Sequence, residues 1–162
     1  MLVQLRLLYP SYPMNTPISA LLERKSSAIY SVAPCLFVTQ AVAEMNHRRV
    51  GCILVMDQGR LVGIFTERDV LKRVVGAGLD PRVARVNDVM TGNLTTVTPQ
   101  ATVGEVMDIF TSKRCRHLPV MNGDRLVGLI SIGDVSRFMA DVHRTECEHL
   151  KSYIAGGFPL DT

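Results

Sequence analysis

One segment of this chain occurs twice. Residues 29–75 align without a gap on residues 94–140, at a constant offset of 65 positions. The run RLVG at 60–63 recurs unchanged at 125–128, and many of the other aligned pairs are conservative exchanges. An internal repeat of this length predicts two copies of one structural unit. We expect the copies to be related by a pseudo-two-fold axis, with paired sites at the interface between them.

The hydrophobic pattern gives both copies the same order of elements: a strand, an amphipathic helix, two strands joined by a tight turn, and a second helix. A short lead-in helix precedes each copy, and copy one carries three extra residues after it, within 23–28. The strands are expected at 29–32, 52–56 and 61–65 in copy one, and at 94–97, 117–121 and 126–130 in copy two. Pro119 falls inside one of them and predicts either an edge strand or an interrupted ladder. The fold class is therefore α/β, with small mixed sheets flanked by helices.

The repeat also divides the chain. We expect a flexible leader at 1–13, the first repeat at 14–78, the second at 79–141, and a helical extension with a tail at 142–162. Thr16 is predicted to cap the first helix, with Pro17 at its first position. Met14 is an alternative to Met1 as the start of the protein.

Composition excludes several classes of protein. A net charge of +3 is too small to indicate nucleic-acid binding by itself. No apolar run is long enough to span a membrane. The four cysteines show no C-x-x-C spacing, which indicates a reduced, cytoplasmic protein. His143 and Cys147 are spaced four residues apart on a predicted helix, but further ligands are missing, so no metal site is expected.

Both copies end their third strand with the pattern G-h-h-[ST]-x-x-D, at 63–69 and at 128–134. A hydroxyl followed three residues later by an acid is a capping-box arrangement, with Asp in place of the usual Glu or Gln. The same groups also suit a nucleotide. A helix N-terminus favours phosphate, and an Asp one turn later can accept hydrogen bonds from a ribose diol. Arg68 adds a guanidinium for phosphate in copy one.

With these motifs, the order of elements and the Val-x-Pro openings, residues 16–141 resemble a CBS-domain pair, also called a Bateman module. The continuation beyond them resembles small stand-alone bacterial members. The resemblance implies two symmetry-related clefts that bind adenine nucleotides or adenosyl compounds, and a flat homodimer of modules. It does not choose among AMP, ADP, ATP, NAD(H) and an adenosylmethionine-type ligand, or between one occupied cleft and two.

Carried over to this sequence, the resemblance implies specific residues for each cleft. The first cleft is expected to combine Thr66, Arg68, Asp69, Thr95, Thr96, Arg116 and His117. The second is expected to combine Ser131, Asp134, Tyr30, Ser31, Gly51 and Cys52. Since copy two has Gly133 where copy one has Arg68, we expect the Asp69 cleft to be the stronger phosphate site. His117 has an alternative reading as a half-buried strand histidine.

The leading functional hypothesis is a non-catalytic, homodimeric sensor of an adenine nucleotide that signals to a protein target the sequence does not identify. One alternative is a protein-interaction module without a ligand. Another is a nucleotide hydrolase, which would need a nucleophile–base pair or a metal cluster that the sequence does not show. Nucleic-acid binding is a further alternative, and it lacks a recognition helix.

Overall fold

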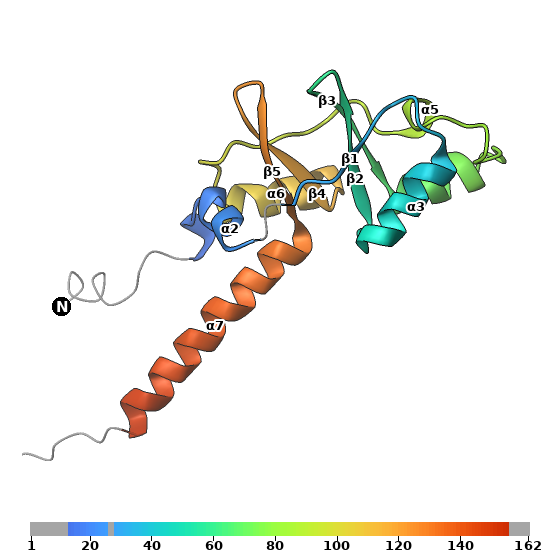
Figure 1. Cartoon of the computed structure of the whole chain (residues 1–162). Coiled ribbons are helices and arrows are strands. Elements are labelled where there is room, and N and C mark those ends of the chain that lie inside the picture. The colour runs from blue at the N-terminus through green and yellow to red at the C-terminus, as the bar shows by residue number, and fades with distance from the viewer. Residues whose placement is uncertain (1–12, 26–27, 156–162) are drawn as a thin grey trace, which may run out of the picture.

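The computed structural model describes residues 13–25 and 28–155, which form two α/β units and a long helix that leaves one of them (Figure 1). The elements in chain order are η1 (Pro13–Asn15), α2 (Ile18–Arg24), β1 (Ser31–Val32), α3 (Val38–Arg48), β2 (Cys52–Asp57), β3 (Arg60–Thr66), α4 (Glu67–Asp69), η2 (Val70–Val75), α5 (Val86–Val89), α6 (Val103–Lys113), β4 (His117–Asn122), β5 (Arg125–Ser131) and α7 (Ile132–Ala155). This order confirms the predicted fold class. The predicted leader lies outside the described residues except for Pro13, which begins η1.

The two sheets repeat each other closely. In the first unit β1 pairs in parallel with β2, and β2 pairs antiparallel with β3. In the second unit β4 pairs antiparallel with β5. The register of the first hairpin shifts between Val55 and Met56, and that of the second shifts between Val120 and Met121, the equivalent positions. The pseudo-symmetry read from the sequence therefore extends to the irregularities of the strands.

The strand expected over 94–97 is reduced to a single residue. Only Val97 pairs, through an isolated parallel bridge to β4. In the first unit the N–H of Leu54 donates to the carbonyl of Tyr30 at 3.1 Å. The position equivalent to Leu54 is Pro119, which has no N–H to donate, so the ladder cannot extend past Val97 in the same way. Pro119 therefore lies in a strand of a two-stranded sheet and at the point where pairing with residues 94–97 stops, which agrees with both readings of this proline.

The two lead-in helices are exchanged between the units. Ile18 and Leu21 of α2 are buried in the core formed by α6, β4, β5 and the start of α7. Val86 and Val89 of α5 are buried in the core formed by α3, β2, β3 and η2. Figure 1 shows α2 beside β5 and α6, and α5 beside α3, each far from the copy that it precedes in the sequence. Each hydrophobic core is therefore completed by a segment from the other half of the chain.

The start of α2 differs from the prediction. Pro17 occupies the N-cap position instead of Thr16, and no side chain caps the helix. The first two N–H groups of α2 donate instead to the carbonyls of Ala101 and Pro99, at 2.8 and 2.9 Å. The N–H groups at the start of α5 are held in the same way by carbonyls that precede α3. These bonds satisfy the free donors of each helix and fix the exchange.

Two glycines mark the places where the exchanged segments touch the strands. A methyl group at Gly63 of β3 would overlap Met90 Sδ and lie 3.1 Å from its Cγ and Cε. At Gly128 of β5 it would lie 2.8 Å from Leu22 Cδ2. The glycine that opens each repeated motif therefore leaves room for a side chain of the exchanged lead-in segment, Met90 at Gly63 and Leu22 at Gly128.

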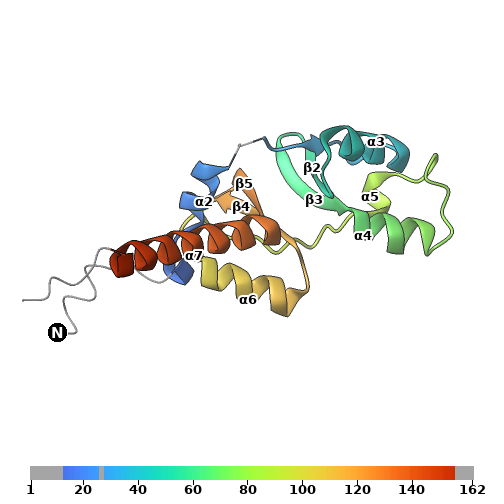
Figure 2. The same ribbon diagram turned by 90° about the horizontal axis from the view of Figure 1, so that it is seen from below.

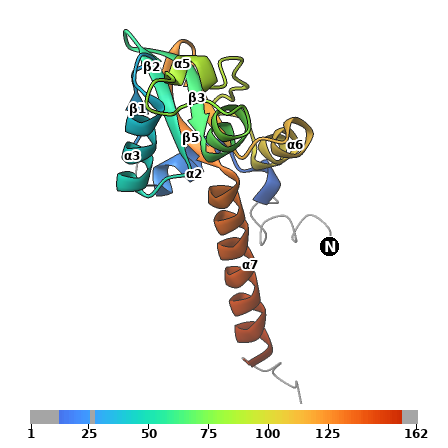
Figure 3. The same ribbon diagram turned by 90° about the vertical axis from the view of Figure 1, so that its right-hand side faces the viewer.

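The C-terminal helix α7 begins inside the second unit and then leaves it. Val135 and Phe138 in its first turns are buried in the core with α2 and α6. Figure 2 shows α2, α6 and the start of α7 around the β4–β5 hairpin, and Figure 3 shows the rest of α7 extending away from both units. Among the described residues, no helix is both long and apolar enough to cross a membrane.

Candidate functional site

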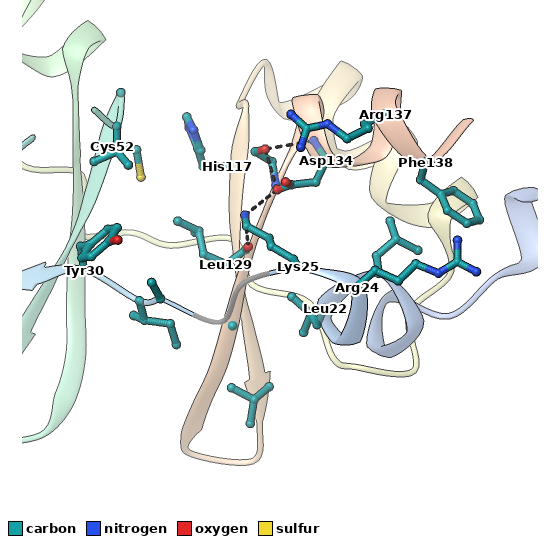
Figure 4. A pocket seen from close by; sticks show the side chains of 18 of the residues that line it. Leu22, Arg24, Lys25, Tyr30, Cys52, His117, Leu129, Asp134, Arg137 and Phe138 are labelled. Carbon is teal, nitrogen blue, oxygen red and sulfur yellow. Dashed lines mark hydrogen bonds and ion pairs between the residues drawn. The ribbon is translucent and has the colours of Figure 1, made fainter. Parts of the chain in front are cut away.

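A cavity of about 610 Å³ lies between the two units (Figure 4). One wall comes from the first copy and includes Tyr30, Gly51 and Cys52. The opposite wall comes from α2, β5 and α7, with Ser131 and Asp134 at the start of α7. The volume falls within the usual range for small-molecule sites. The cavity therefore lies at the interface between copies, where the repeat predicted a site.

Asp134 is the best-connected polar group in the cavity. Its Oδ2 accepts hydrogen bonds from the Ser131 N–H at 2.8 Å, the Ser131 hydroxyl at 2.7 Å and Lys25 Nζ at 2.7 Å. The Asp134 N–H donates back to Ser131 Oγ at 3.2 Å, which completes the predicted capping box. Burial alone would raise the pKa of Asp134, but the bonds from Lys25 and Ser131 outweigh it and lower the pKa below its usual value.

Asp69 forms the equivalent box and is more deeply buried than Asp134. Its Oδ2 accepts from the Thr66 N–H at 2.9 Å and the Thr66 hydroxyl at 2.7 Å. Its Oδ1 accepts from the Thr91 hydroxyl at 3.1 Å, and Arg73 Nη1 lies 3.6 Å away. Only 6% of Asp69 is exposed. Both carboxylate oxygens are therefore already bound by groups of the protein.

The predicted preference for the Asp69 cleft depended on Arg68 as a phosphate ligand. In the structure this side chain binds a backbone carbonyl instead. Its Nη1 donates to the carbonyl of Arg114 at 2.7 Å, in the left-handed residue that ends α6. This bond joins the two units and engages the guanidinium that we expected to bind phosphate. The cavity lining includes none of the following residues predicted for the first cleft: Thr66, Arg68, Asp69, Thr95, Thr96 and Arg116. The geometry weighs against the predicted ranking of the two clefts.

The cavity brings together most residues predicted for the second cleft. Tyr30, Gly51, Cys52, Ser131 and Asp134 line it, whereas Ser31 does not. His117 lines it too, although we had assigned this residue to the Asp69 cleft. The reason is the register of the second hairpin, which places His117 opposite Ser131.

Besides Asp134, the buried side chains of Cys52 and His117 in the lining have shifted pKa values. Burial raises the pKa of the Cys52 thiol to about 12, and the charge of Asp69 adds to this effect against that of Lys25. Burial lowers the pKa of His117, and the charges of Arg116 and Lys25 act in the same direction against nearby carboxylates. Both side chains therefore favour their uncharged forms, which suits a wall against an aromatic base better than a contact to phosphate.

Sequence reasoning missed the cationic part of the lining. The lining contains four cationic side chains and two carboxylates: Arg24, Lys25, Arg48 and Arg137, with Asp134 and Asp141. The guanidinium of Arg48 lies over the Tyr30 ring, with 4.8 Å from Cζ to the centroid, and that of Arg24 lies 5.6 Å from the Phe138 centroid. The one available signal was the three-residue insertion within 23–28, which places Lys25 at the cavity.

Two α/β units with exchanged lead-in helices and a cavity between them define a tandem CBS-domain module. The model of the CBS domain family matches residues 36–76 and 86–141, and the chain belongs to this family. A CBS-domain pair is a regulatory module.

Individual relatives agree with this assignment. The mitochondrial CBS domain-containing protein CBSX3 of Arabidopsis thaliana is 39% identical over 126 residues, which are 75% of this chain and 61% of that protein. The chain thus spans less than two thirds of that relative. The crystal structure of a CBS-domain protein from Agrobacterium tumefaciens is 36% identical with a TM-score of 0.72, covering 75% of this chain and 98% of the other. The structure of a protein with CBS domains from Burkholderia ambifaria is 34% identical with a TM-score of 0.72, and it covers 90% of this chain and 100% of the other.

Proposed function

We propose that this chain is a non-catalytic sensor that binds an adenosyl ligand in the cavity at Asp134. The observation that carries the proposal is the cavity itself, which combines the Ser131–Asp134 pair at a helix start with cationic side chains and apolar walls from both units. A structure of the same fold, the CBS-domain pair of protein MJ0100, was solved in complex with 5′-methylthioadenosine and S-adenosyl-L-methionine. It is 20% identical to this chain with a TM-score of 0.68, and it supports the choice of probes.

Each part of the cavity has a role in this proposal. The carboxylate of Asp134 accepts hydrogen bonds from the ribose hydroxyls, as acidic residues do in other nucleotide sites. The side chains of Ile29 and Leu129, which lie in the lining, pack against the base. A group extending from the ribose meets the cationic side chains. No charged nucleophile or metal is required, because binding alone is the function.

The position of the cavity suggests how binding is read. A ligand held between the two units stabilises the arrangement of the units that binds it more tightly. This difference in affinity between two arrangements is what allows a ligand to shift a conformational equilibrium. A protein partner that recognises one packing would then respond to the ligand. The predicted homodimer gives a second interface on which the same shift could act, and light scattering on the purified chain measures whether it forms.

The test is a binding screen of the full chain by thermal shift and calorimetry, with AMP, ADP, ATP, NAD(H), S-adenosylmethionine and, as a control, GMP. A ligand at a hundred times its Kd stabilises the native state by about 2.7 kcal/mol, which a thermal shift resolves. We expect at least one adenosyl compound to bind and GMP not to bind.

The matched variants are Asp134→Asn and Asp69→Asn, which remove the same charge from the two equivalent positions. Asp134→Asn is expected to weaken binding at least about tenfold through loss of a charged acceptor. Asp69→Asn is expected to lower stability and leave the Kd within about twofold, since Asp69 is buried and lies outside the cavity lining. Failure of every adenosyl compound to bind would overturn the proposal and favour a protein-interaction module. Equal losses in the two variants would overturn its assignment to the Asp134 cavity.

A further inference from the structure

On the cavity wall formed by α2, β5 and α7, Lys25 joins the end of α2 to the start of α7 through a contact that the repeat does not explain. It is the C-cap residue of α2 and lies in the stretch 23–28, within which copy one carries three extra residues. Its ammonium donates to Asp134 Oδ2 at 2.7 Å and to the carbonyl of Leu129 at 3.2 Å. Figure 4 shows the Lys25 side chain running from the end of α2 to Asp134 and the carbonyl of Leu129, opposite the wall that holds Tyr30 and Cys52.

The equivalent place in the other half of the molecule is occupied differently. There the segment that follows α5 contributes Thr91, whose hydroxyl donates to Asp69 Oδ1 at 3.1 Å. The hydrogen bond to Asp69 Oδ1 comes from a neutral hydroxyl, with the guanidinium of Arg73 farther away at 3.6 Å, whereas a charged ammonium bonds directly to Asp134. The side chain of Lys25 is 36% exposed and that of Asp134 is 21% exposed, so solvent and ligands can reach the ion pair.

From this contrast we propose that Lys25 is the residue that selects for anionic ligands in the Asp134 cavity. The inference rests on the proposed adenosyl site and names the charge of its ligand. In the empty cavity Lys25 neutralises Asp134. When a ribose hydroxyl takes over the carboxylate, the ammonium is released and binds an anionic group carried by the same ligand.

The charges around the cavity favour this exchange. Among the described residues of the lining, Asp141 is the only carboxylate other than Asp134, while Arg24, Arg48 and Arg137 are cationic. A released ammonium therefore has few anions of the protein to bind, and the surrounding positive charge opposes its staying unpaired. A neutral nucleoside displaces the Lys25 ammonium from Asp134 but offers it no anion in exchange. A nucleotide with a phosphate displaces Lys25 from Asp134 and also provides a new anion for its ammonium.

The experiment compares adenosine with AMP by calorimetry on the full chain, in the wild type, Lys25→Met, Lys25→Arg and Lys113→Met. Lys25→Met removes the ammonium but keeps an unbranched side chain. Lys113→Met removes the same charge from an exposed position on α6 outside the cavity lining. Circular dichroism and thermal melting establish that each variant is folded. 5′-Methylthioadenosine serves as a second uncharged probe.

We expect the wild type to prefer AMP over adenosine. In Lys25→Met, AMP should bind about tenfold more weakly, from loss of a charged hydrogen bond. Adenosine should bind equally well or up to about fivefold more tightly, from loss of a competing surface ion pair. The preference for AMP should survive in Lys25→Arg and Lys113→Met.

The outcomes separate this inference from the function on which it rests. A wild type that binds neither adenosine nor AMP overturns the adenosyl site and this inference together. A wild type that binds both, with the ratio of the two Kd values unchanged in Lys25→Met, overturns the role of Lys25 alone. A wild type that binds 5′-methylthioadenosine more tightly than AMP has the same consequence, because a ligand without an anionic group gives the ammonium of Lys25 nothing to bind.

Discussion

Replacing Gly63 with alanine tests whether the exchanged lead-in segment really packs on β3. Gly63 has no positive φ, so the backbone accepts alanine, and reduced freedom of the unfolded chain would stabilise the protein by about 0.4–1 kcal/mol. The new methyl group, however, would overlap Met90 Sδ and lie 3.1 Å from Cγ and Cε. Overpacking of this kind costs about 1–3 kcal/mol. We therefore expect a net loss of about 1–2 kcal/mol.

The assay is urea denaturation combined with thermal melting of four proteins: wild type, Gly63→Ala, Met90→Ala and the double variant. For a chain of this size, the loss in Gly63→Ala corresponds to a Tm lowered by roughly 2–8 °C. Met90→Ala destabilises the protein on its own, because a half-buried side chain is lost from the core around α5. It also removes the atoms that collide with the new methyl group. The coupling in this double-mutant cycle should thus be about 1–3 kcal/mol in favour of the double variant.

A matched glycine gives the opposite expectation. A methyl group at Gly133, in the first turn of α7, would have only an ordinary contact at 3.7 Å with Ser131 Oγ. Gly133→Ala should therefore stabilise the protein by about 0.5–1 kcal/mol, the difference in helix propensity. The packing argument would be refuted if Gly63→Ala were neutral or stabilising, or if its cost were the same with and without the Met90 side chain.

Two further predictions follow from shifted pKa values. Because burial raises the pKa of Cys52 to about 12, a thiol reagent at pH 8 should label the exposed Cys35 and Cys147 of the native protein and spare Cys52. The unfolded thiol ionises from about pH 8.5, so the free energy of unfolding should fall above that pH, and labelling of Cys52 as fast as Cys35 would contradict the burial. The pKa of His117 is lowered in the folded protein, so folding favours its neutral form. The contribution of His117 to the free energy of unfolding should therefore be complete above about pH 6.5, the pKa in the unfolded chain, and should be lost as the pH falls below it. Urea titrations between pH 5 and 7 should show a flatter dependence in His117→Gln, and an unchanged slope would count against the shift.

The sequence predicted the order of elements because the repeat supplies every hydrophobic pattern twice. The helices at 38–48 and 103–113, and both hairpins, begin and end within a few residues of the expected positions. The ladder stops at Pro119 for a local reason, the missing N–H, which a single sequence reveals. Patterns of this kind depend on neighbours along the chain.

What the sequence did not reveal depends on neighbours in space. Aligning the lead-in helices shows that they are equivalent, but not that each packs on the other copy. The assignment of Arg68 to phosphate followed from its chemical type, and the structure offers it the carbonyl of Arg114 instead. Lys25 could not be found by comparing the copies, because it lies in the stretch 23–28, where the two copies differ in length.

The exchange of α2 and α5 has a consequence for any chain that carries one copy alone. Such a chain would hold a lead-in helix with no core to receive it and a core with no helix to close it, since Ile18 and Val86 are each fully buried against the opposite copy. Two such chains would complete each other by reciprocal donation. Cutting this protein between the two copies should likewise give two fragments that fold only when they are mixed, because each fragment carries the lead-in helix of the other's core.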